Sequence, residues 1–415
     1  MYKFTVILYR VRYCLLGLGA AGKTSLVNQV IGKMFKDEYD PTEGIEQKVT
    51  VIKLSEETTG DWVECTDSLA ELARQDLLAQ IHQKTLSTEK VNTPSQAAPK
   101  KDEDSPSDQK EASGARVPES LTPPLPEKHI VVGQVPDSLK SKLDTDPELF
   151  YQLDILDFAG QWDFYSVHHA FLDKRSVFLI VIDVSVPLDS EDERHFHVEA
   201  RSGPGPKTGR ESILYWLSSV FSIVGIVGDK EQKPCILIVG THKDLLTEDP
   251  DDAEGQNLES EKIKKKLREI IKTHPAKDLV DEDDIVIISN KHRNQKEMAE
   301  LRRKMLEIAK NQHFWGEEVP TRWWSLELKI KEKAESESKM IMKIDEVESL
   351  LKDSVEVEKE EMINLLLFLH SKGDLMYFKT RELQNHAVIN LKKFVSVLKV
   401  CMIYIFLLPY TVCSL

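Results

Sequence analysis

Positive charge is scarce in this sequence. Its 55 Lys and Arg residues are outnumbered by 70 Asp and Glu residues, which gives a formal net charge of −15 over 415 residues. A protein that binds nucleic acid regardless of sequence needs a basic face, so nucleic acid is not expected as a partner, although a local basic patch stays compatible with this balance. The hydrophobic content of 41% is enough for packed cores. The length predicts about two to three domains.

Cysteine is also scarce. The five cysteines form no Cys-x2-Cys pair, which argues against a zinc or redox site of that kind. Cys14 and Cys235 lie inside apolar, strand-like runs and are expected to be buried free thiols. Free thiols suit a reducing compartment, so the expected location is the cytoplasm.

A long apolar segment is missing at both ends. The final run, 400–415, holds about 14 apolar residues and is short for a membrane span, so a truncated gene product or an alternative end is favoured over a membrane anchor. Cys413 is third from the end and does not form a four-residue prenylation motif. The N-terminus has one positive charge and no cleavage site of small residues, and it predicts an extra strand or a truncated start rather than a signal peptide.

The strongest motif that is present is Gly17–Thr24, which matches Gly-x4-Gly-Lys-Ser/Thr without a mismatch. A short apolar strand, 12–16, precedes it, and a helix with an apolar face follows from Ser25. Such a loop turns backbone N–H groups toward phosphate oxygens, while Lys23 supplies a point charge and Thr24 a hydroxyl for Mg²⁺. The expected phosphate contacts are Gly17, Gly19, Ala20, Ala21, Gly22, Lys23, Thr24 and Ser25.

The segment after the first helix is a loop that contains Pro41 and Gly44. Thr42 lies where switch-type GTPases place the threonine that senses the γ-phosphate through Mg²⁺, and a plain loop hydroxyl is the alternative. Residues 48–54 alternate polar and apolar, which predicts an edge-type strand.

An insertion from about 55 to 146 interrupts the pattern. It contains a possible helix, 68–83, and a Pro-, Ser- and charge-rich stretch, 86–128, that is expected to be disordered. A long insertion costs little loop-closure entropy, so it does not count against a surrounding domain. Its Pro-rich end could dock a partner, but a plain linker is the preferred interpretation.

A second motif follows the strand predicted over 150–156. Asp157 can hold a Mg²⁺-bound water, Gly160 can offer its N–H to the γ-phosphate, and Gln161 lies where switch GTPases keep the glutamine that orients the attacking water. A mobile second switch is expected over 162–172. The pair His168 and His169 falls within it, and structural contacts are favoured over metal binding because no second ligand pair lies nearby.

Apolar runs alternate with amphipathic segments over the rest of the first 312 residues. Continuous apolar runs predict buried parallel strands, and helical spacing predicts the segments between them. The predicted architecture is α/β, a doubly wound domain with its ligand at the carboxyl ends of the strands. The predicted strands are 176–184, 234–240 and 284–289, and the predicted helices are about 211–223, 258–273 and 297–312, with an acidic loop at 249–255.

The strand over 234–240 ends in Thr241-His242-Lys243-Asp244. Asp244 can accept hydrogen bonds from the guanine N1–H and exocyclic amine, a pair of donors that adenine lacks. The stem of Lys243 can lie over the base. Thr241 replaces the more familiar asparagine of such a motif, and His242 completes it. Ser289 and Asn290 are expected in a base-contacting loop.

With these residues placed, the first 312 residues resemble a Ras-like GTPase, and more narrowly the Roc domain of Roco proteins. The narrowing features are Thr42-x-Gly-Ile-Glu46, the Asp157–Gln161 motif with Tyr165 and His168 after it, and Thr241–Asp244. The resemblance implies bound GTP or GDP, Mg²⁺ held by Thr24, Thr42 and Asp157, and Gln161 as the catalytic residue. No arginine finger is evident in these motifs, so slow intrinsic turnover is expected, roughly 10⁻³ to 10⁻² per second without an activator.

Residues 313–399 are expected to be mainly α-helical and resemble the start of a COR domain, the partner that follows Roc. A helix is predicted to begin within 318–324, another over 359–372 with Gly373 as its cap, and a strand over 374–378. The segment departs from the family pattern because it stops near Lys399, with no leucine-rich repeats before Met1 and no kinase after it. The resemblance implies a possible homodimer through COR, with a second copy as the activator.

Two functions from different classes fit these motifs. The first is a Mg²⁺-dependent GTPase that acts as a nucleotide-controlled signalling switch on unidentified protein effectors. The second is a non-catalytic GTP/GDP-binding scaffold that recruits partners through the insertion and the COR-like segment. An ATPase is a weaker third reading, and Asp244 argues against it.

Overall fold

A computed structural model describes residues 5–36, 42, 45–53, 62–64, 150–160, 165–191, 205–225, 235–292, 294–352, 358–391, 393–398 and 400. The helix predicted over 68–83, most of the insertion, Gln161 and the final apolar run lie outside the described residues. No helix in the described ranges is long and apolar enough to cross a membrane.

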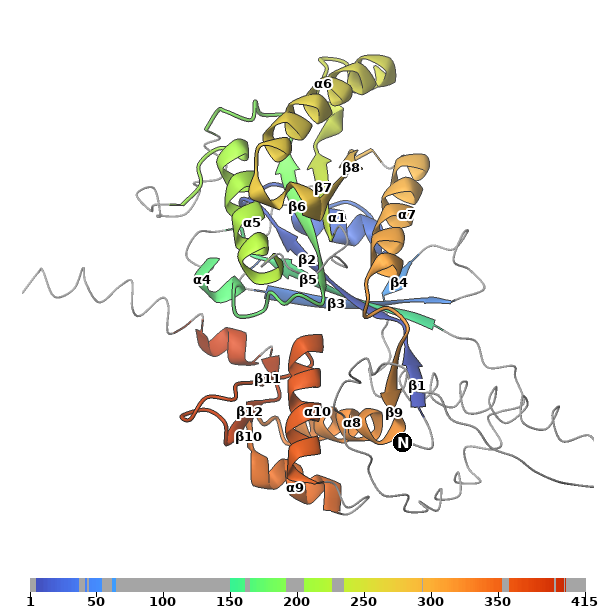
Figure 1. Cartoon of the computed structure of the whole chain (residues 1–415). Helices are drawn as coiled ribbons and strands as arrows, with labels where there is room; N and C mark the ends of the chain where they lie inside the picture. Colours follow the sequence, from blue (N-terminus) through green and yellow to red (C-terminus); the bar gives the residue numbers. More distant parts are fainter. Residues whose placement is uncertain are drawn as a thin grey trace, which may run out of the picture.

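A seven-stranded sheet forms the centre of the fold, in the order β4-β3-β5-β2-β6-β7-β8 (Figure 1). The five strands β5, β2, β6, β7 and β8 run parallel, whereas β3 pairs antiparallel with β5 on one side and with the edge strand β4 on the other. The confirmed parallel core is the doubly wound arrangement that the alternating pattern predicts. The strands are β2 (Arg10–Leu16), β3 (Ile45–Lys53), β4 (Val63–Glu64), β5 (Phe150–Phe158), β6 (Ser176–Asp183), β7 (Ile236–Thr241) and β8 (Val280–Ile287).

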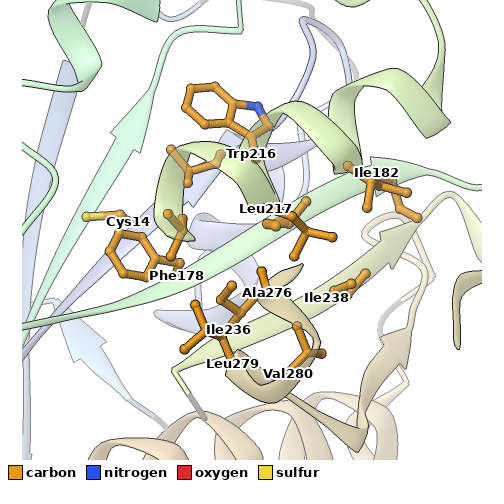
Figure 2. Close-up of a cluster of buried hydrophobic side chains, with 14 of the residues drawn as sticks. Cys14, Phe178, Ile182, Trp216, Leu217, Ile236, Ile238, Ala276, Leu279 and Val280 are labelled. Carbon is orange, nitrogen blue, oxygen red and sulfur yellow. The ribbon is translucent and has the colours of Figure 1, made fainter. Parts of the chain in front are cut away.

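Helices cover both faces of this sheet. Successive residues of a strand point to opposite sides, so the continuous apolar strands present an apolar surface on each face. Cys14 and Leu16 of β2 belong to a core cluster with α5 and α6, whereas Tyr13 and Leu15 belong to a second cluster with α1 and α7. Figure 2 shows the first cluster, in which Trp216 and other side chains lie over the sheet. The helices are α1 (Lys23–Val30), α5 (Gly209–Val224), α6 (Ala253–Lys272) and α7 (Gln295–Asn311).

The helices α1, α5, α6 and α7 start earlier than the periodicity predicts, and side-chain caps explain the starts of α5 and α6. Thr208 and Glu211 form a capping box, so α5 begins at Gly209. Asp252 accepts a hydrogen bond from the Gly255 backbone N–H at 2.9 Å, so α6 begins inside the stretch predicted as an acidic loop. The acidic residues there stabilise the N-terminus of α6 by opposing its positive dipole end, in addition to forming a polar surface.

The N-terminal strand β1 (Thr5–Leu8) pairs antiparallel with β9 (Glu317–Pro320), where Thr5 faces Pro320 and Leu8 faces Glu317. β1 is the extra strand expected at the N-terminus. The helix start predicted within 318–324 is confirmed, since α8 (Thr321–Ser336) begins at Thr321, directly after β9. Pro320 is the last residue of β9. Proline has no backbone N–H and cannot donate a hydrogen bond to the neighbouring strand, so it suits the end of a strand.

The elements after β9 have a hydrophobic core of their own, which includes Ile330, Met342, Val347, Leu366 and Leu369. The predicted helix over 359–372 is confirmed as α10 (Lys359–Lys372), and Gly373 ends it with φ 70°. The mainly helical expectation needs one addition, a small sheet in the order β10-β12-β11. The remaining elements are α9 (Ile344–Lys352), β10 (Ile341–Lys343), β11 (Met376–Tyr377) and β12 (His386–Val388).

A buried cluster of charges joins these C-terminal elements to the start of β2. Arg10 Nη1 lies 2.7 Å from Glu327 Oε1 of α8, and Lys331 and Lys372 lie at 2.7 Å from the same carboxylate. Asp374 forms ion pairs with both lysines, at 2.8 Å to Lys331 and 2.9 Å to Lys372. These five residues, Arg10, Glu327, Lys331, Lys372 and Asp374, are called the interface charge cluster below. Figure 1 shows the C-terminal elements gathered below the central sheet.

Candidate nucleotide-binding site

The loop between β2 and α1 has a backbone that only particular residues allow. Gly17 has φ 150°, and a Cβ there would lie 2.2 Å from the Val181 carbonyl oxygen of β6. Ala20 and Gly22 also have positive φ, at 56° and 77°. Such left-handed residues turn successive N–H groups toward one side of a loop and create a concave anion site. The loop therefore has the form that the Gly-x4-Gly-Lys-Thr pattern predicts.

Helix α1 begins at Lys23 with no side-chain cap at Gly22 and no acidic residue in its first turn. Helix starts normally fill their free N–H groups with a capping oxygen, so this start is open to an anion. The Lys23 side chain is 6% exposed, and its ammonium donates to the carbonyl oxygens of Gly17 at 3.0 Å and Leu18 at 2.7 Å. Burial lowers the pKa of Lys23 to about 8, although Asp157 opposes the shift.

Three candidate metal ligands meet beside Lys23. Thr24 Oγ1 donates to Asp157 Oδ2 at 2.5 Å, and Thr42 Oγ1 lies 2.7 Å from Thr24 Oγ1 and 3.4 Å from Asp157 Oδ2. Asp157 is fully buried, and its Oδ1 has no partner among the described residues. Burial raises the pKa of Asp157 in spite of the Thr24 hydrogen bond and the Lys23 charge. Two hydroxyls and a desolvated carboxylate with an unused oxygen fit a small hard cation such as Mg²⁺.

Gly160 lies directly against the phosphate loop. A Cβ at this position would be 2.3 Å from the Gly19 backbone N and 2.4 Å from the Leu18 carbonyl carbon. Only glycine allows the segment after β5 to approach so closely. The neighbouring Gln161 lies outside the described residues, so its place at the site stays a prediction.

The predicted base-binding residues come from two loops that both bond to the phosphate loop. Thr241 Oγ1 lies 2.8 Å from the Ala21 carbonyl oxygen, and Asn290 Nδ2 donates to the Gly22 carbonyl oxygen at 3.1 Å. Asp244 Oδ1 accepts from Ser289 Oγ at 2.6 Å, and both side chains are buried. Residues from separate strands therefore converge at the carboxyl edge of the sheet, as expected for a ligand site of this fold.

The Lys243 ammonium has two side-chain partners that the sequence does not predict. Its ammonium bonds to Asn257 Oδ1 of α6 at 2.7 Å and Glu297 Oε1 of α7 at 2.5 Å. These bonds fix the ammonium beside two helices, and the placement of the Lys243 stem over the base stays a prediction. The adjacent His242 lies next to Gly22, since its Cε1 is 3.5 Å from the place of a Cβ on that glycine.

His168 makes the structural contacts that the sequence favours for the histidine pair. His168, in α4 (Tyr165–His168), is fully buried, and its ring centroid lies 4.6 Å from that of Phe158 and 6.0 Å from that of Trp216. Burial lowers the pKa of His168 well below its ordinary value, so the ring is neutral. No cluster of three or more His, Cys, Asp or Glu side chains suited to a metal occurs in the described ranges.

The sequence reasoning missed Asp183, the last residue of β6. Its Oδ2 lies 3.3 Å from His242 Nδ1, and its side chain is 2% exposed. A carboxylate at the carboxyl end of a parallel strand was the available signal, because ligand sites of open α/β sheets gather at that edge.

Comparisons with known proteins agree with this geometry. The sequence model of the Ras family matches residues 12–63, which include the phosphate loop and Thr42. The chain contains a Ras-like α/β domain. The Ras-like domain and the elements after it also superpose on a solved structure, Methanosarcina barkeri Roco2 RocCORdC bound to GDP. That match has a TM-score of 0.50 and 16% identity and covers 94% of this chain and 76% of the other.

A curated relative is the probable serine/threonine-protein kinase pats1 of Dictyostelium discoideum. It is 25% identical over 228 residues, which are 54% of this chain. The matched part spans only 6% of that protein's length. The likeness thus concerns one segment of a much longer protein.

Proposed function

We propose that this chain binds guanine nucleotides with Mg²⁺, hydrolyses GTP to GDP, and acts as a switch of the Roco type, a Roc domain followed by part of a COR domain. The observation that carries the proposal is the convergence of separate motifs. The phosphate loop bonds to Thr241 and Asn290, while Asp244 is held by Ser289 on the same edge. The Ras-like fold and its GDP-bound structural neighbour support the same reading.

Each predicted site residue would have a distinct chemical role. Lys23 would exchange two carbonyl oxygens for the phosphates, and the open N–H groups of the loop and α1 would bind the remaining phosphate oxygens. Thr24, Thr42 and Asp157 would hold Mg²⁺, which neutralises charge on the β- and γ-phosphates. Gly160 would offer its N–H to the γ-phosphate, and Gln161 would orient the attacking water.

Guanine selection would rest on Asp244. The Ser289 hydroxyl occupies Asp244 Oδ1 at 2.6 Å and fixes the carboxylate in place. A fixed, buried acceptor gains two donors from guanine and is left unpaired by adenine, which disfavours ATP. A competition experiment of ATP against GTP tests that preference directly.

Replacing Asp244 with asparagine should weaken GDP binding by about 100-fold, because charge-assisted hydrogen bonds are replaced by weaker ones and one donor is mispaired. Binding of xanthosine diphosphate should improve, since its C2 carbonyl can accept from the new amide. Affinities of both nucleotides measured by calorimetry check this. Asp251→Asn removes the same charge from an exposed residue and should leave both affinities unchanged. Unaltered GDP affinity in Asp244→Asn would remove Asp244 from the base site.

Replacing Gln161 with leucine should slow single-turnover GTP hydrolysis by about 100-fold while GTP affinity stays within about twofold, because only water orientation is lost. The wild-type chain must first show turnover. Tight GTP binding without hydrolysis in the wild type, alone or at concentrations that favour dimers, would select the scaffold alternative instead. Hydrolysis at the wild-type rate in Gln161→Leu would place the water-orienting group elsewhere.

We also propose a cytoplasmic location, a homodimer formed through residues 313–399, and protein effectors. The buried free thiols Cys14 and Cys235 support the reducing compartment. Sedimentation with GDP and with a non-hydrolysable GTP analogue tests the dimer and its dependence on nucleotide.

A further inference from the structure

Asp183 and His242 end two neighbouring strands of the sheet. β6 and β7 run parallel, and the register places Asp183 beside Thr241, the residue before His242. The carboxylate of one strand is thereby brought against the imidazole that follows the next. Neither side chain belongs to the phosphate loop or to the Thr24, Thr42 and Asp157 group.

The two oxygens of Asp183 have different partners. Oδ1 accepts from the Ser185 backbone N–H at 2.8 Å and from Ser185 Oγ at 2.6 Å. Oδ2 lies 3.3 Å from His242 Nδ1. Burial alone would raise the pKa of Asp183, but the bonds from His242 and Ser185 lower it to about 2. Asp183 is therefore ionised at neutral pH and can only accept hydrogen bonds.

That requirement assigns the proton on His242. An imidazole nitrogen that faces an ionised carboxylate must carry its hydrogen, because two acceptors would otherwise oppose each other. Nδ1 also lies 3.1 Å from Thr241 Oγ1, so the hydroxyl oxygen can accept from the same N–H. The hydroxyl proton can then go to the Ala21 carbonyl oxygen at 2.8 Å, the nearer of two acceptors, the other being the Ile182 carbonyl oxygen at 3.1 Å. A chain of hydrogen bonds runs from Asp183 through His242 and Thr241 to the phosphate loop.

The backbone and exposure of His242 set it apart from its neighbours. Its φ of 61° is left-handed, which is uncommon for a residue other than glycine and is concentrated at functional sites. Its side chain is 28% exposed, whereas Thr241, Lys243 and Asp244 are buried. Its Cε1 lies 3.5 Å from the place of a Cβ on Gly22. The ring therefore presents an accessible edge beside the phosphate loop and next to Asp244.

We propose that Asp183 is a positioning residue for guanine-nucleotide binding: it fixes the His242 imidazole with the proton on Nδ1, so that the ring flanks the base and Thr241 stays bonded to the phosphate loop. This proposal rests on the proposed function, since it assumes that a guanine nucleotide occupies the site. Asp183 acts through His242 and does not itself touch the nucleotide.

The test is a double-mutant cycle on the release of a fluorescent GDP analogue from the full chain. Asp183→Ala and His242→Ala should each speed release by about tenfold, the effect of losing one bond to a charged group. The double variant should release GDP no faster than His242→Ala, because the carboxylate has nothing left to position. Ser185→Ala removes only a bond to Oδ1 and should stay within about twofold of the wild type.

A second measurement separates positioning from folding. Asp183→Asn keeps an oxygen that can accept from Nδ1–H, so release should fall between the wild type and Asp183→Ala. The ¹⁵N shifts of His242 in the nucleotide-free protein should report a protonated Nδ1 in the wild type and a mixture of tautomers in Asp183→Ala.

Several outcomes would overturn the inference. Release of GDP from Asp183→Ala at the wild-type rate would do so. A second such outcome is that Asp183→Ala speeds release as much in the His242→Ala background as in the wild type. That result would mean that the carboxylate only supports the Ser185 turn. An unprotonated Nδ1 in the free protein would also reject it. Failure of the wild-type chain to bind GDP would instead overturn the proposed function, and the shift measurement would still decide the tautomer.

Discussion

Replacing Glu327 with alanine should lower the free energy of unfolding by about 3–5 kcal/mol, the usual cost of removing one partner from a buried ion pair. Glu327 is 3% exposed and accepts from Arg10, Lys331 and Lys372, each at 2.7 Å. Without it, three buried cations share the single carboxylate of Asp374 within the interface charge cluster. Uncompensated charge in a site with little water is the cause of the expected loss.

The pH dependence of this effect has a definite sign. Burial alone would raise the pKa of Glu327, but Arg10, Lys331 and Lys372 hold it well below the ordinary value. A carboxyl group whose pKa is depressed by folding contributes stability above its unfolded pKa, about 4.3, and loses it as the pH falls toward the folded value. The destabilisation of Glu327→Ala should thus be full at pH 7 and shrink in acid.

Urea unfolding of the full chain at pH 7 and pH 4, followed by circular dichroism, measures both expectations. Glu337→Ala is the matched control, because Glu337 lies close after α8 and pairs with Lys333 at 2.7 Å while being 46% exposed. Exposed pairs contribute about 0–1 kcal/mol, so this control should change stability little. Equal losses of stability in the two variants would show that Glu327 in the interface charge cluster contributes no more to stability than an exposed ion pair.

Replacing Lys23 with alanine should weaken GTP binding by about 10²- to 10⁴-fold, because two hydrogen bonds between an ammonium and phosphates are lost. The same change should not reduce the stability of the nucleotide-free protein. Burial lowers the pKa of Lys23 to about 8, so the ammonium is less favourable in the folded chain than in the unfolded one. Affinity and stability should consequently move independently in this variant.

Calorimetric titration with GTP and thermal unfolding without nucleotide check the two halves of that prediction. Lys36→Ala removes an exposed lysine from the segment after α1 and should change neither quantity by much. A loss of affinity accompanied by an equal loss of stability would indicate that Lys23 supports the fold rather than the ligand.

The local sequence pattern was sufficient to predict those elements whose structure is set by a single physical effect. The eight residues of β6 are all buried, and their continuous apolar run predicted a strand covered on both faces. The phosphate loop was predictable because glycine is required where a Cβ would meet the Val181 carbonyl at 2.2 Å. Gly373 likewise marked the end of α10 through its φ of 70°.

Features that depend on distant partners could not be predicted in this way. Arg10 and Glu327 are 317 residues apart, and no periodicity relates them. The partners of the Lys243 ammonium, Asn257 and Glu297, come from α6 and α7 and leave no signal near Lys243 in the sequence. Asp183 gained its role only through the strand register that sets it beside Thr241. The sequence shows that these residues are present, but their contacts are set by the tertiary structure.

The pairing of β1 with β9 has a mechanical consequence. Thr5 faces Pro320 at one end of this ribbon, and Leu8 faces Glu317 at the other, where both strands join the Ras-like domain. Tension applied between Thr5 and the chain beyond Pro320 would load the hydrogen bonds one after another, as a zip opens, rather than all at once. The ribbon should yield at low force, before the seven-stranded sheet, and leave the buried charges between β2 and α8 as the next barrier to separation.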